Sequence, residues 1–144
     1  MDPIEQFKIV NLFPVGTFGH TEIAFTNSAA FMLGAVVLLT LFLVVGSAGG
    51  RAVPTRLQSA AELTYEFVAT MLRSTAGSEG MRFFPFVFTI FMFVLTLNMF
   101  GIIPYAFTVT SHIIVTAALA LTVFFTVLIY GLIRHGFHFF NLFV

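Results

Sequence analysis

The chain has 144 residues, of which 59% are hydrophobic and only 8% are charged, and six basic residues balance six acidic ones. Soluble domains carry roughly 25% charged residues, so a chain this short and this apolar cannot hide its hydrophobic surface in water and is expected to lie in lipid. The zero net charge argues against nucleic acid or an acidic substrate as a partner, and the absence of cysteine excludes disulfides and thiolate metal sites.

Residues 1–24 are predicted to lie on one surface of the membrane. They carry Asp2, Glu5 and Glu22 against a single lysine, and no basic stretch precedes an apolar core, so the segment does not have the pattern of a signal peptide. The first membrane span would then act as an uncleaved signal.

Three uncharged stretches are each long enough to cross a bilayer, which takes about 20 apolar residues. They cover residues 25–48, 83–103 and 112–133. Pro85 falls in the first turn of the second stretch, where a missing backbone N–H costs little. The sequence therefore predicts an all-α integral membrane protein with three transmembrane helices.

The connection over residues 49–82 contains a fourth helical pattern, PTRLQSAAELTYEFVATMLR, which begins at Pro54. Apolar residues recur in it at helical spacing, which is typical of an amphipathic helix lying along the membrane interface. A loop helix packed on its own protein is the alternative. A turn at residues 77–80 is expected to lead into the second span. The predicted apolar side holds Leu57, Ala60, Ala61, Thr64, Phe67, Val68, Met71 and Leu72, and the predicted polar side holds Arg56, Gln58, Ser59, Glu62, Glu66 and Arg73.

The distribution of basic residues predicts the direction in which the chain crosses the membrane, because loops rich in Lys and Arg stay inside. The outer side would hold residues 1–24, with only Lys8, and the 104–111 loop, which has no basic residue. The inner side would hold residues 49–82 and 134–144. These inner segments carry Arg51, Arg56, Arg73, Arg82 and Arg134.

Asn98 is a polar residue inside the second span, about five residues from its outer end. An amide in hydrocarbon is costly unless it finds a hydrogen-bond partner. One interpretation is a bond to a neighbouring helix that holds the bundle together. The other is a residue that lines a water-filled entry and orients water in a chain that passes protons. The position favours the first interpretation.

A second polar group, Thr110, Ser111 and His112, stands at the start of the third span. Thr or Ser at this place is a common N-cap of a helix. The imidazole of His112 can gain and lose a proton near neutral pH, which suits an aqueous mouth. A short loop joins the two spans, so Asn98 and this group are predicted to converge near the outer surface.

The remaining polar residues do not indicate a metal or catalytic site. His135 and His138 are three residues apart without Asp, Glu or Cys nearby, so histidines at the membrane interface are a better interpretation than a metal site. His20 stands alone. The sequence has no Gly-rich phosphate loop, no catalytic dyad and no carboxylate inside a span. It therefore predicts no enzyme, no cofactor and no metal.

Two segments resemble a known family. The run FFPFVFTIFMFVLTLNMFGIIPYAFTVTSHIIVTAALAL, followed by GLIRHGFHFF, is similar to the a subunits of F-type ATP synthases, most of all those of alphaproteobacteria. The upstream PTRLQSAAELTYEFV also resembles the family's segment after its first helix. The resemblance covers nearly the whole chain, and the LN..G..PY.F..TSH pattern is its most specific part.

The resemblance implies a membrane stator subunit beside a rotating ring of c subunits. Two offset aqueous half-channels would let protons reach and leave a ring carboxylate. Asn98 and the Thr110–His112 group match polar positions at the outer half-channel. The interfacial helix, with Arg56, Glu62 and Glu66, would lie near the b-type subunits of the peripheral stalk. The expected location is a bacterial inner membrane, with protons as the coupling ion and no nucleic acid as a partner.

One departure from the family pattern is expected to matter. The family's indispensable arginine, which separates the half-channels, lies on a helix beyond the third span. The sequence ends at Val144, and Arg134 lies outside the bilayer at the inner end of the third span, so it is not a substitute. The residues would then correspond to about the front half of the usual length. A non-conducting membrane scaffold or assembly protein is the alternative, and a solute transporter is disfavoured because no charged or discontinuous site appears at mid-membrane.

Overall fold

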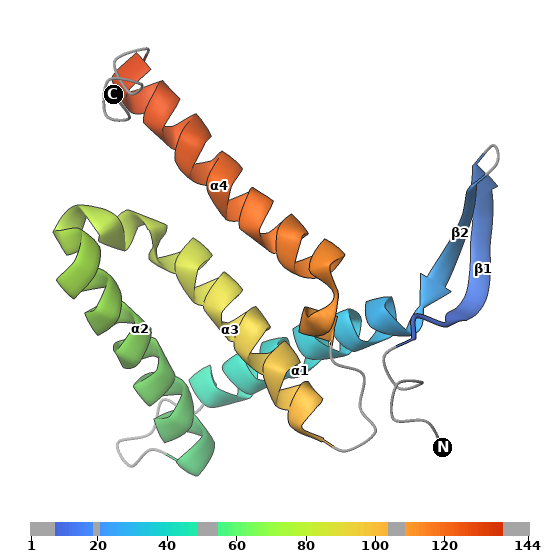
Figure 1. Ribbon diagram of the computed structural model, residues 1–144. Helices are drawn as coiled ribbons and strands as arrows, with labels where there is room; N and C mark the ends of the chain where they lie inside the picture. The colour runs from blue at the N-terminus through green and yellow to red at the C-terminus, as the bar shows by residue number, and fades with distance from the viewer. Residues whose placement is uncertain (1–7, 19–20, 49–54, 104–108, 137–144) are drawn as a thin grey trace. The chain divides into compact units, whose positions relative to one another are not determined.

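The computed structural model describes residues 8–18, 21–48, 55–103 and 109–136. They form two compact units, Met1–Val109 and Thr110–Val144, and each is described by itself. Figure 1 shows the elements in chain order. These are β1 (Asn11–Phe18), β2 (Thr21–Thr26), α1 (Asn27–Ser47), α2 (Arg56–Gly80), the 3₁₀ turn η2 (Met81–Phe83), α3 (Phe84–Ile102), the 3₁₀ turn η3 (Val109–Ser111) and α4 (Ile113–His135).

Among the described residues, three helical stretches are long and apolar enough to cross a membrane, so the predicted all-α membrane fold is confirmed. They are α1, α4 and the stretch Arg56–Ile102, whose uncharged part is α3. At 1.5 Å per residue, the 21 residues of α1 extend about 31 Å, close to the roughly 30 Å hydrocarbon layer. Aliphatic side chains of α1 such as Leu33 and Leu41 are exposed, as expected of a helix that meets lipid.

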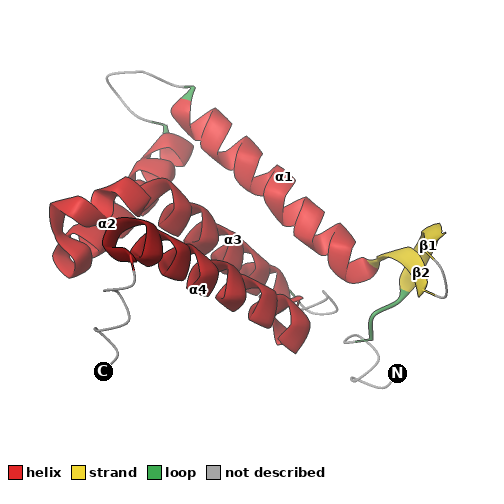
Figure 2. Ribbon diagram, turned by 90° about the horizontal axis from the view of Figure 1, so that it is seen from above, coloured by secondary structure: helices red, strands yellow, loops and turns green. Residues whose placement is uncertain are grey.

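A two-stranded antiparallel hairpin precedes α1, an element that the sequence did not predict. β1 pairs with β2 from Asn11↔Thr26 to Phe18↔Thr21, with register shifts near Leu12 and Val15. The rings of Phe13 and Phe25 stack across the pair, with centroids 5.0 Å apart. Figure 2 shows this hairpin at the N-terminal end of α1.

Asn27 joins the hairpin to the first turn of α1. Its Oδ1 accepts from the Val10 N–H at 3.1 Å, and its Nδ2 donates to the Lys8 carbonyl at 3.0 Å. Its backbone N–H donates to the Val10 carbonyl at 3.1 Å. The preceding Thr26 is the N-cap, and its Oγ1 accepts from the Ala29 N–H. The chain entering β1 is therefore fixed to the start of the helix.

Replacing Asn27 with Ala is expected to loosen this junction without unfolding α1, because Thr26 still caps the helix. Losing the side-chain bonds to Val10 and Lys8 costs about 1 kcal/mol, so the Val10 amide should exchange its hydrogen roughly fivefold faster. Hydrogen exchange read by NMR on the chain in detergent micelles measures this. Thr40→Val is the control, because it removes a bond to Val36 inside α1. An unchanged Val10 rate in Asn27→Ala would contradict the assignment.

α2 is amphipathic, but its packed side is rotated toward the predicted polar side. Gln58 is buried together with Val68 and Ala69, whereas Leu57 and Phe67 are exposed. The packed side of α2 thus includes Gln58 of the predicted polar side, while Leu57 and Phe67 of the predicted apolar side are not covered by the protein, as expected of a face turned toward lipid. The reason is that α2 packs on its own protein along one side and leaves an apolar side uncovered. Its position along a membrane interface stays a prediction.

The turn predicted at residues 77–80 is a kink that separates two helical pieces within Arg56–Gly80. Gly77 has φ 69° and ψ −166°, a backbone conformation that favours glycine because side chains with a Cβ rarely adopt it. η2 follows, and Pro85 lies in the first turn of α3. Figure 1 shows α2 and α3 as a helical hairpin on either side of this bend.

An aromatic core holds α2 against α3. Val68, Ala69 and Phe84 are buried together. The Tyr65 ring meets the edge of the Phe84 ring with centroids 4.6 Å apart, and Phe84 stacks with Phe88 at 5.4 Å. Aromatic pairs in such geometry add about 0.5–1.5 kcal/mol beyond area burial. This core fixes the α2 face that borders the candidate site.

α1 approaches both other helices of its unit. At its C-terminal end, a Cβ on Gly46 would lie 2.8 Å from the Cβ of Ala61 in α2. Near its N-terminal end, Phe31 meets Phe100 of α3 with ring centroids 6.2 Å apart. Gly46 therefore permits the close crossing of α1 and α2.

Candidate functional site

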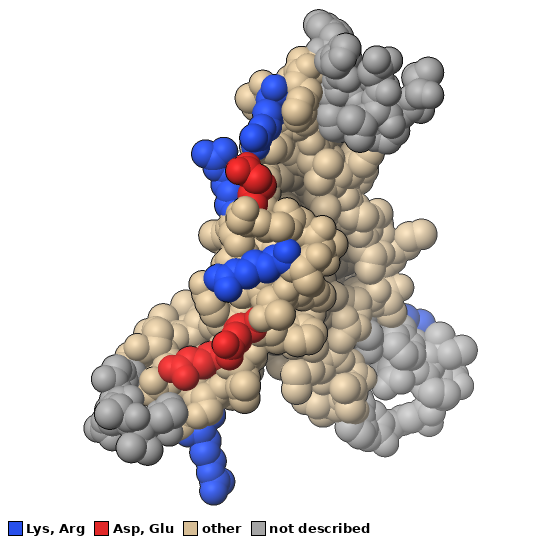
Figure 3. Space-filling view, turned by 90° about the vertical axis from the view of Figure 1, so that its left-hand side faces the viewer, with Lys and Arg blue, Asp and Glu red and all other residues tan. Residues whose placement is uncertain are grey.

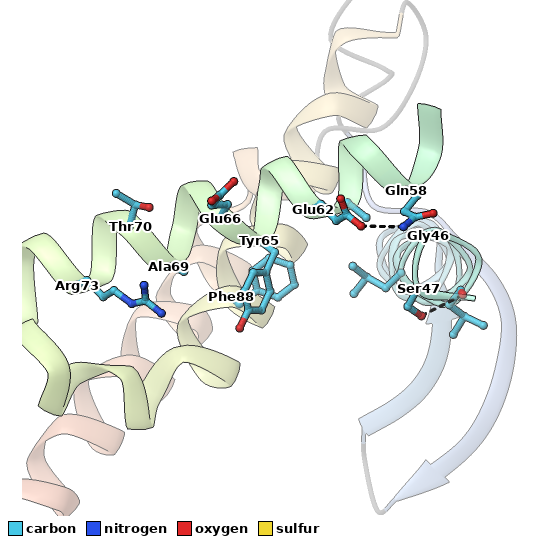
Figure 4. Close-up of a pocket in the computed structure, with 13 residues that line it drawn as sticks. Gly46, Ser47, Gln58, Glu62, Tyr65, Glu66, Ala69, Thr70, Arg73 and Phe88 are labelled. Carbon is cyan, nitrogen blue, oxygen red and sulfur yellow. Dashed lines mark hydrogen bonds between the residues drawn. The ribbon is translucent and has the colours of Figure 1, made fainter. Parts of the chain in front are cut away.

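A cavity of about 830 Å³ opens between the C-terminal end of α1 and one side of α2. Figure 4 shows Gly46 and Ser47 on one side and the α2 residues on the other, with Phe88 of α3 below. Its walls are both apolar and polar. The lining residues are Leu43, Val44, Gly46, Ser47, Gln58, Ala61, Glu62, Tyr65, Glu66, Ala69, Thr70, Arg73 and Phe88.

Charged and amide side chains form a narrow stripe along the cavity. Glu62 and Glu66 are one helical turn apart, and Arg73 lies two turns further on the same side. Gln58 Nε2 donates to Glu62 Oε1 at 2.8 Å, and this bond fixes the orientation of the Gln58 amide. Figure 3 shows acidic and basic side chains following one another on the face of the molecule that carries α2.

Glu62 and Glu66, two of the three residues predicted to face the stalk, thus line one cavity. Arg56, the third, is the first residue of α2 and is not among the lining residues. Sequence reasoning did not find the contribution of Gly46 and Ser47. The signal available for them was the small-residue run Gly-Ser-Ala that ends the first span.

Asn98 lies on an exposed side of α3, near its C-terminal end. Its Nδ2 donates to the Val94 carbonyl at 2.8 Å, one turn back along the same helix. The adjacent Leu97 is fully buried, and Thr96 is buried with its Oγ1 bonded to the Met92 carbonyl. The packed side of α3 at this level is therefore formed by Thr96 and Leu97, while Asn98 is open to its surroundings.

The Thr110–His112 group precedes α4 but does not cap it in the predicted way. Thr110 and Ser111 belong to the 3₁₀ turn η3, and His112 occupies the N-cap position without a side-chain cap bond. The N-cap interpretation of Thr or Ser was therefore wrong, because the helix starts later than expected, at Ile113. The His112 carbonyl accepts from the N–H groups of Val115 and Thr116 at 3.0 and 3.3 Å.

Asn98 and the Thr110–His112 group belong to different compact units. Residues 104–108 between them lie outside the described part of the chain. Their predicted convergence at an outer mouth therefore stays a prediction.

Other polar residues that the sequence singled out lie near the C-terminal end of α4 or beyond the description. His135 is in the last turn of α4, and Arg134 Nη1 donates to the Tyr130 hydroxyl at 2.9 Å. His20 and His138 lie outside the described residues. Within the described residues, no three His, Asp or Glu side chains come together as a metal site would require.

Comparisons with known proteins agree on one family. The model of the family described as ATP synthase A chain matches residues 29–144. The chain is similar to ATP synthase subunit a of Rhodopseudomonas palustris strain BisA53, with 60% identity over 144 residues, 100% of this chain and 58% of the relative. Its identity to ATP synthase subunit a of Bradyrhizobium diazoefficiens is 58% over 144 residues, again 100% of this chain but 57% of the relative. The chain thus spans somewhat more than half the length of these curated relatives.

Proposed function

The chain belongs to the ATP synthase A chain family, and from this membership we propose that it is part of the membrane stator of a proton-translocating ATP synthase. The predicted family resemblance is confirmed, and the helices make the chain a multi-pass membrane protein. Its proposed role is to form part of the outer aqueous half-channel that delivers protons to a ring of c subunits. The match over residues 29–144, which includes Asn98 and the Thr110–His112 group, carries the proposal.

Asn98 and His112 are the proposed polar groups of the proton path. The exposure of Asn98 supports this role, since Thr96 and Leu97 supply the packing at this level and the amide is left for the lining of a path. His112 stands at the start of a membrane helix, where its imidazole would form part of the polar lining of the path. Neither role requires a bound cofactor or covalent chemistry, and the subunit is proposed to be non-catalytic.

The proposed orientation places the N-terminus outside and α2 inside. The arginines of the connection between α1 and α3 support it, because basic residues favour the inner side. The proposed membrane is a bacterial inner membrane, as suits the bacterial relatives. With α2 inside, the cavity bordered by Glu62, Glu66 and Arg73 would face the b-type subunits of the peripheral stalk. Its mixed charges suit a helix that carries both acidic and basic residues.

Cysteine crosslinking in native membranes tests both proposed contacts. These 144 residues contain no cysteine, so each single-cysteine variant gives one site within them. Leu121→Cys and Phe125→Cys sample exposed positions of α4, and Glu66→Cys samples the cavity. We expect at least one α4 position to crosslink to a c subunit and Glu66→Cys to crosslink to a stalk subunit.

The pattern of crosslinks separates the proposal from its alternative. Ser74→Cys is the matched control for Glu66→Cys, because Ser74 is exposed on α2 but does not line the cavity. A scan of all exposed α4 positions without any c-subunit product would favour the non-conducting scaffold. Equal stalk products from Glu66→Cys and Ser74→Cys would argue against the cavity as the stalk contact.

A further inference from the structure

The strand β1 and the residues that enter it present an apolar surface that nothing in the described part of the chain covers. From Ile9 to Thr21 the sequence has no Asp, Glu, Lys or Arg. Five aliphatic or aromatic side chains in this stretch are 50–66% exposed. They are Ile9, Val10, Leu12, Phe13 and Val15.

This hairpin is not expected to remain ordered in water by itself. An isolated two-stranded hairpin is at best marginally stable, and an uncharged edge strand with exposed apolar side chains invites aggregation. Among the described residues, the aromatic contact between the two strands is the stacked pair of Phe13 and Phe25. A surface that covers the apolar residues is therefore required.

The junction with α1 determines where such a surface lies. Three hydrogen bonds of Asn27, to Val10 and Lys8, fix the chain entering β1 to the first turn of α1. α1 is about as long as the hydrocarbon layer is thick, so its first residue lies at the boundary of that layer. The hairpin directly precedes this residue in the chain and lies at this end of α1, as Figures 1 and 2 show. The uncharged stretch from Ile9 to Thr21 is thus joined to a helix whose side chains Leu33 and Val37 are exposed, as expected in lipid, and the charge of the hairpin, Glu22, lies on β2.

We propose that the β1–β2 hairpin is a membrane-interface anchor, which lays the face carrying Phe13 and Phe25 on the lipid headgroup layer next to the start of α1. Two opposing effects set how deep the hairpin lies in the membrane. Exposed apolar residues favour contact with lipid, and the amphipathic headgroup region accommodates aromatic rings. The two open strand edges carry unpaired backbone groups, which exclude the hairpin from the hydrocarbon layer. The proposal needs only that α1 crosses the membrane and does not depend on the proposed proton path.

A single tryptophan provides the test, because the chain has none. We would reconstitute the Phe13→Trp chain into phosphatidylcholine vesicles and measure quenching by lipids brominated near the headgroup or deep in the acyl chain. Pro14→Trp is the matched control, because Pro14 pairs with Ala24 and therefore lies on the opposite face from the Phe13–Phe25 pair. Val37→Trp, in the middle of α1, calibrates the deep position.

We expect Phe13→Trp to emit at shorter wavelength than Pro14→Trp and to be quenched at least twofold more strongly by the shallow bromines than by the deep ones. Val37→Trp should show the reverse preference. Phe25→Trp, on the same face, gives a second reading if Phe13→Trp disturbs the hairpin. A water-like emission that neither lipid quenches in both face variants would overturn the proposal, as would stronger quenching by the deep bromines. Protection of these positions only in the assembled complex would assign the face to a protein partner instead.

Discussion

Replacing Asn98 with Leu is expected to slow proton-driven ATP synthesis roughly tenfold while the amount of assembled complex stays the same. In the proposed half-channel, the amide holds water for proton transfer, and losing one such hydrogen bond at the highest barrier costs about 1.4 kcal/mol, or tenfold in rate. Assembly should survive because Asn98 lies on the exposed side of α3, beside the fully buried Leu97. ATP synthesis by membrane vesicles under an imposed pH gradient, divided by the amount of complex on native gels, measures the effect.

Two further variants separate the roles of the amide and of its position. Asn98→Gln keeps an amide and should retain most of the rate, whereas Met99→Leu changes the exposed neighbouring residue and should have no effect. A loss of assembled complex in Asn98→Leu would support the other interpretation, in which Asn98 holds helices together. Normal synthesis with normal assembly would remove Asn98 from the proton path.

The sequence predicted the helices well because each depends on a local signal. Long uncharged stretches have few alternatives to a membrane helix, and α1, α3 and α4 begin and end within two residues of the predicted spans. The Gly77 bend was also visible as a turn signal, and the backbone at Gly77 is non-helical. Such features follow from composition over a short stretch, without knowledge of the neighbours.

Features that depend on tertiary contacts could not be predicted in this way. The hairpin was missed because Asn11–Phe18 contains a proline, a glycine and two register shifts, so its apolar residues do not alternate regularly. The burial of Gln58 was not predicted, because its place beside the C-terminal end of α1 is a tertiary contact that no periodicity in α2 reveals. The position of Asn98 on its helix was predicted, but whether neighbours would cover it depends on how α3 packs.

The crossing of α1 and α2 at Gly46 bears on both the fold and the cavity. The Cβ of a residue at position 46 would lie 2.8 Å from the Ala61 Cβ, closer than side chains tolerate, and 3.6 Å from the Leu57 carbonyl oxygen. Gly46→Leu is therefore expected to separate the two helices and destabilise the chain by about 1–3 kcal/mol. The midpoint of thermal unfolding in detergent, followed by circular dichroism, measures the loss. Gly34→Leu is the control, because the same change earlier in α1 meets no atom within 4 Å.

Exchanging the residues at positions 46 and 61 tests whether the close approach of Gly46 to Ala61 is responsible for this loss of stability. Gly46→Ala alone should destabilise the crossing, because its Cβ meets that of Ala61. Adding Ala61→Gly removes the opposing Cβ, and the double variant should recover wild-type stability. The helix propensities cancel in the double variant, since one position gains what the other loses, about 1 kcal/mol. The two changes should therefore be strongly non-additive. If they are additive, the close approach at Gly46 does not hold α1 against α2, and another contact must define the wall of the cavity.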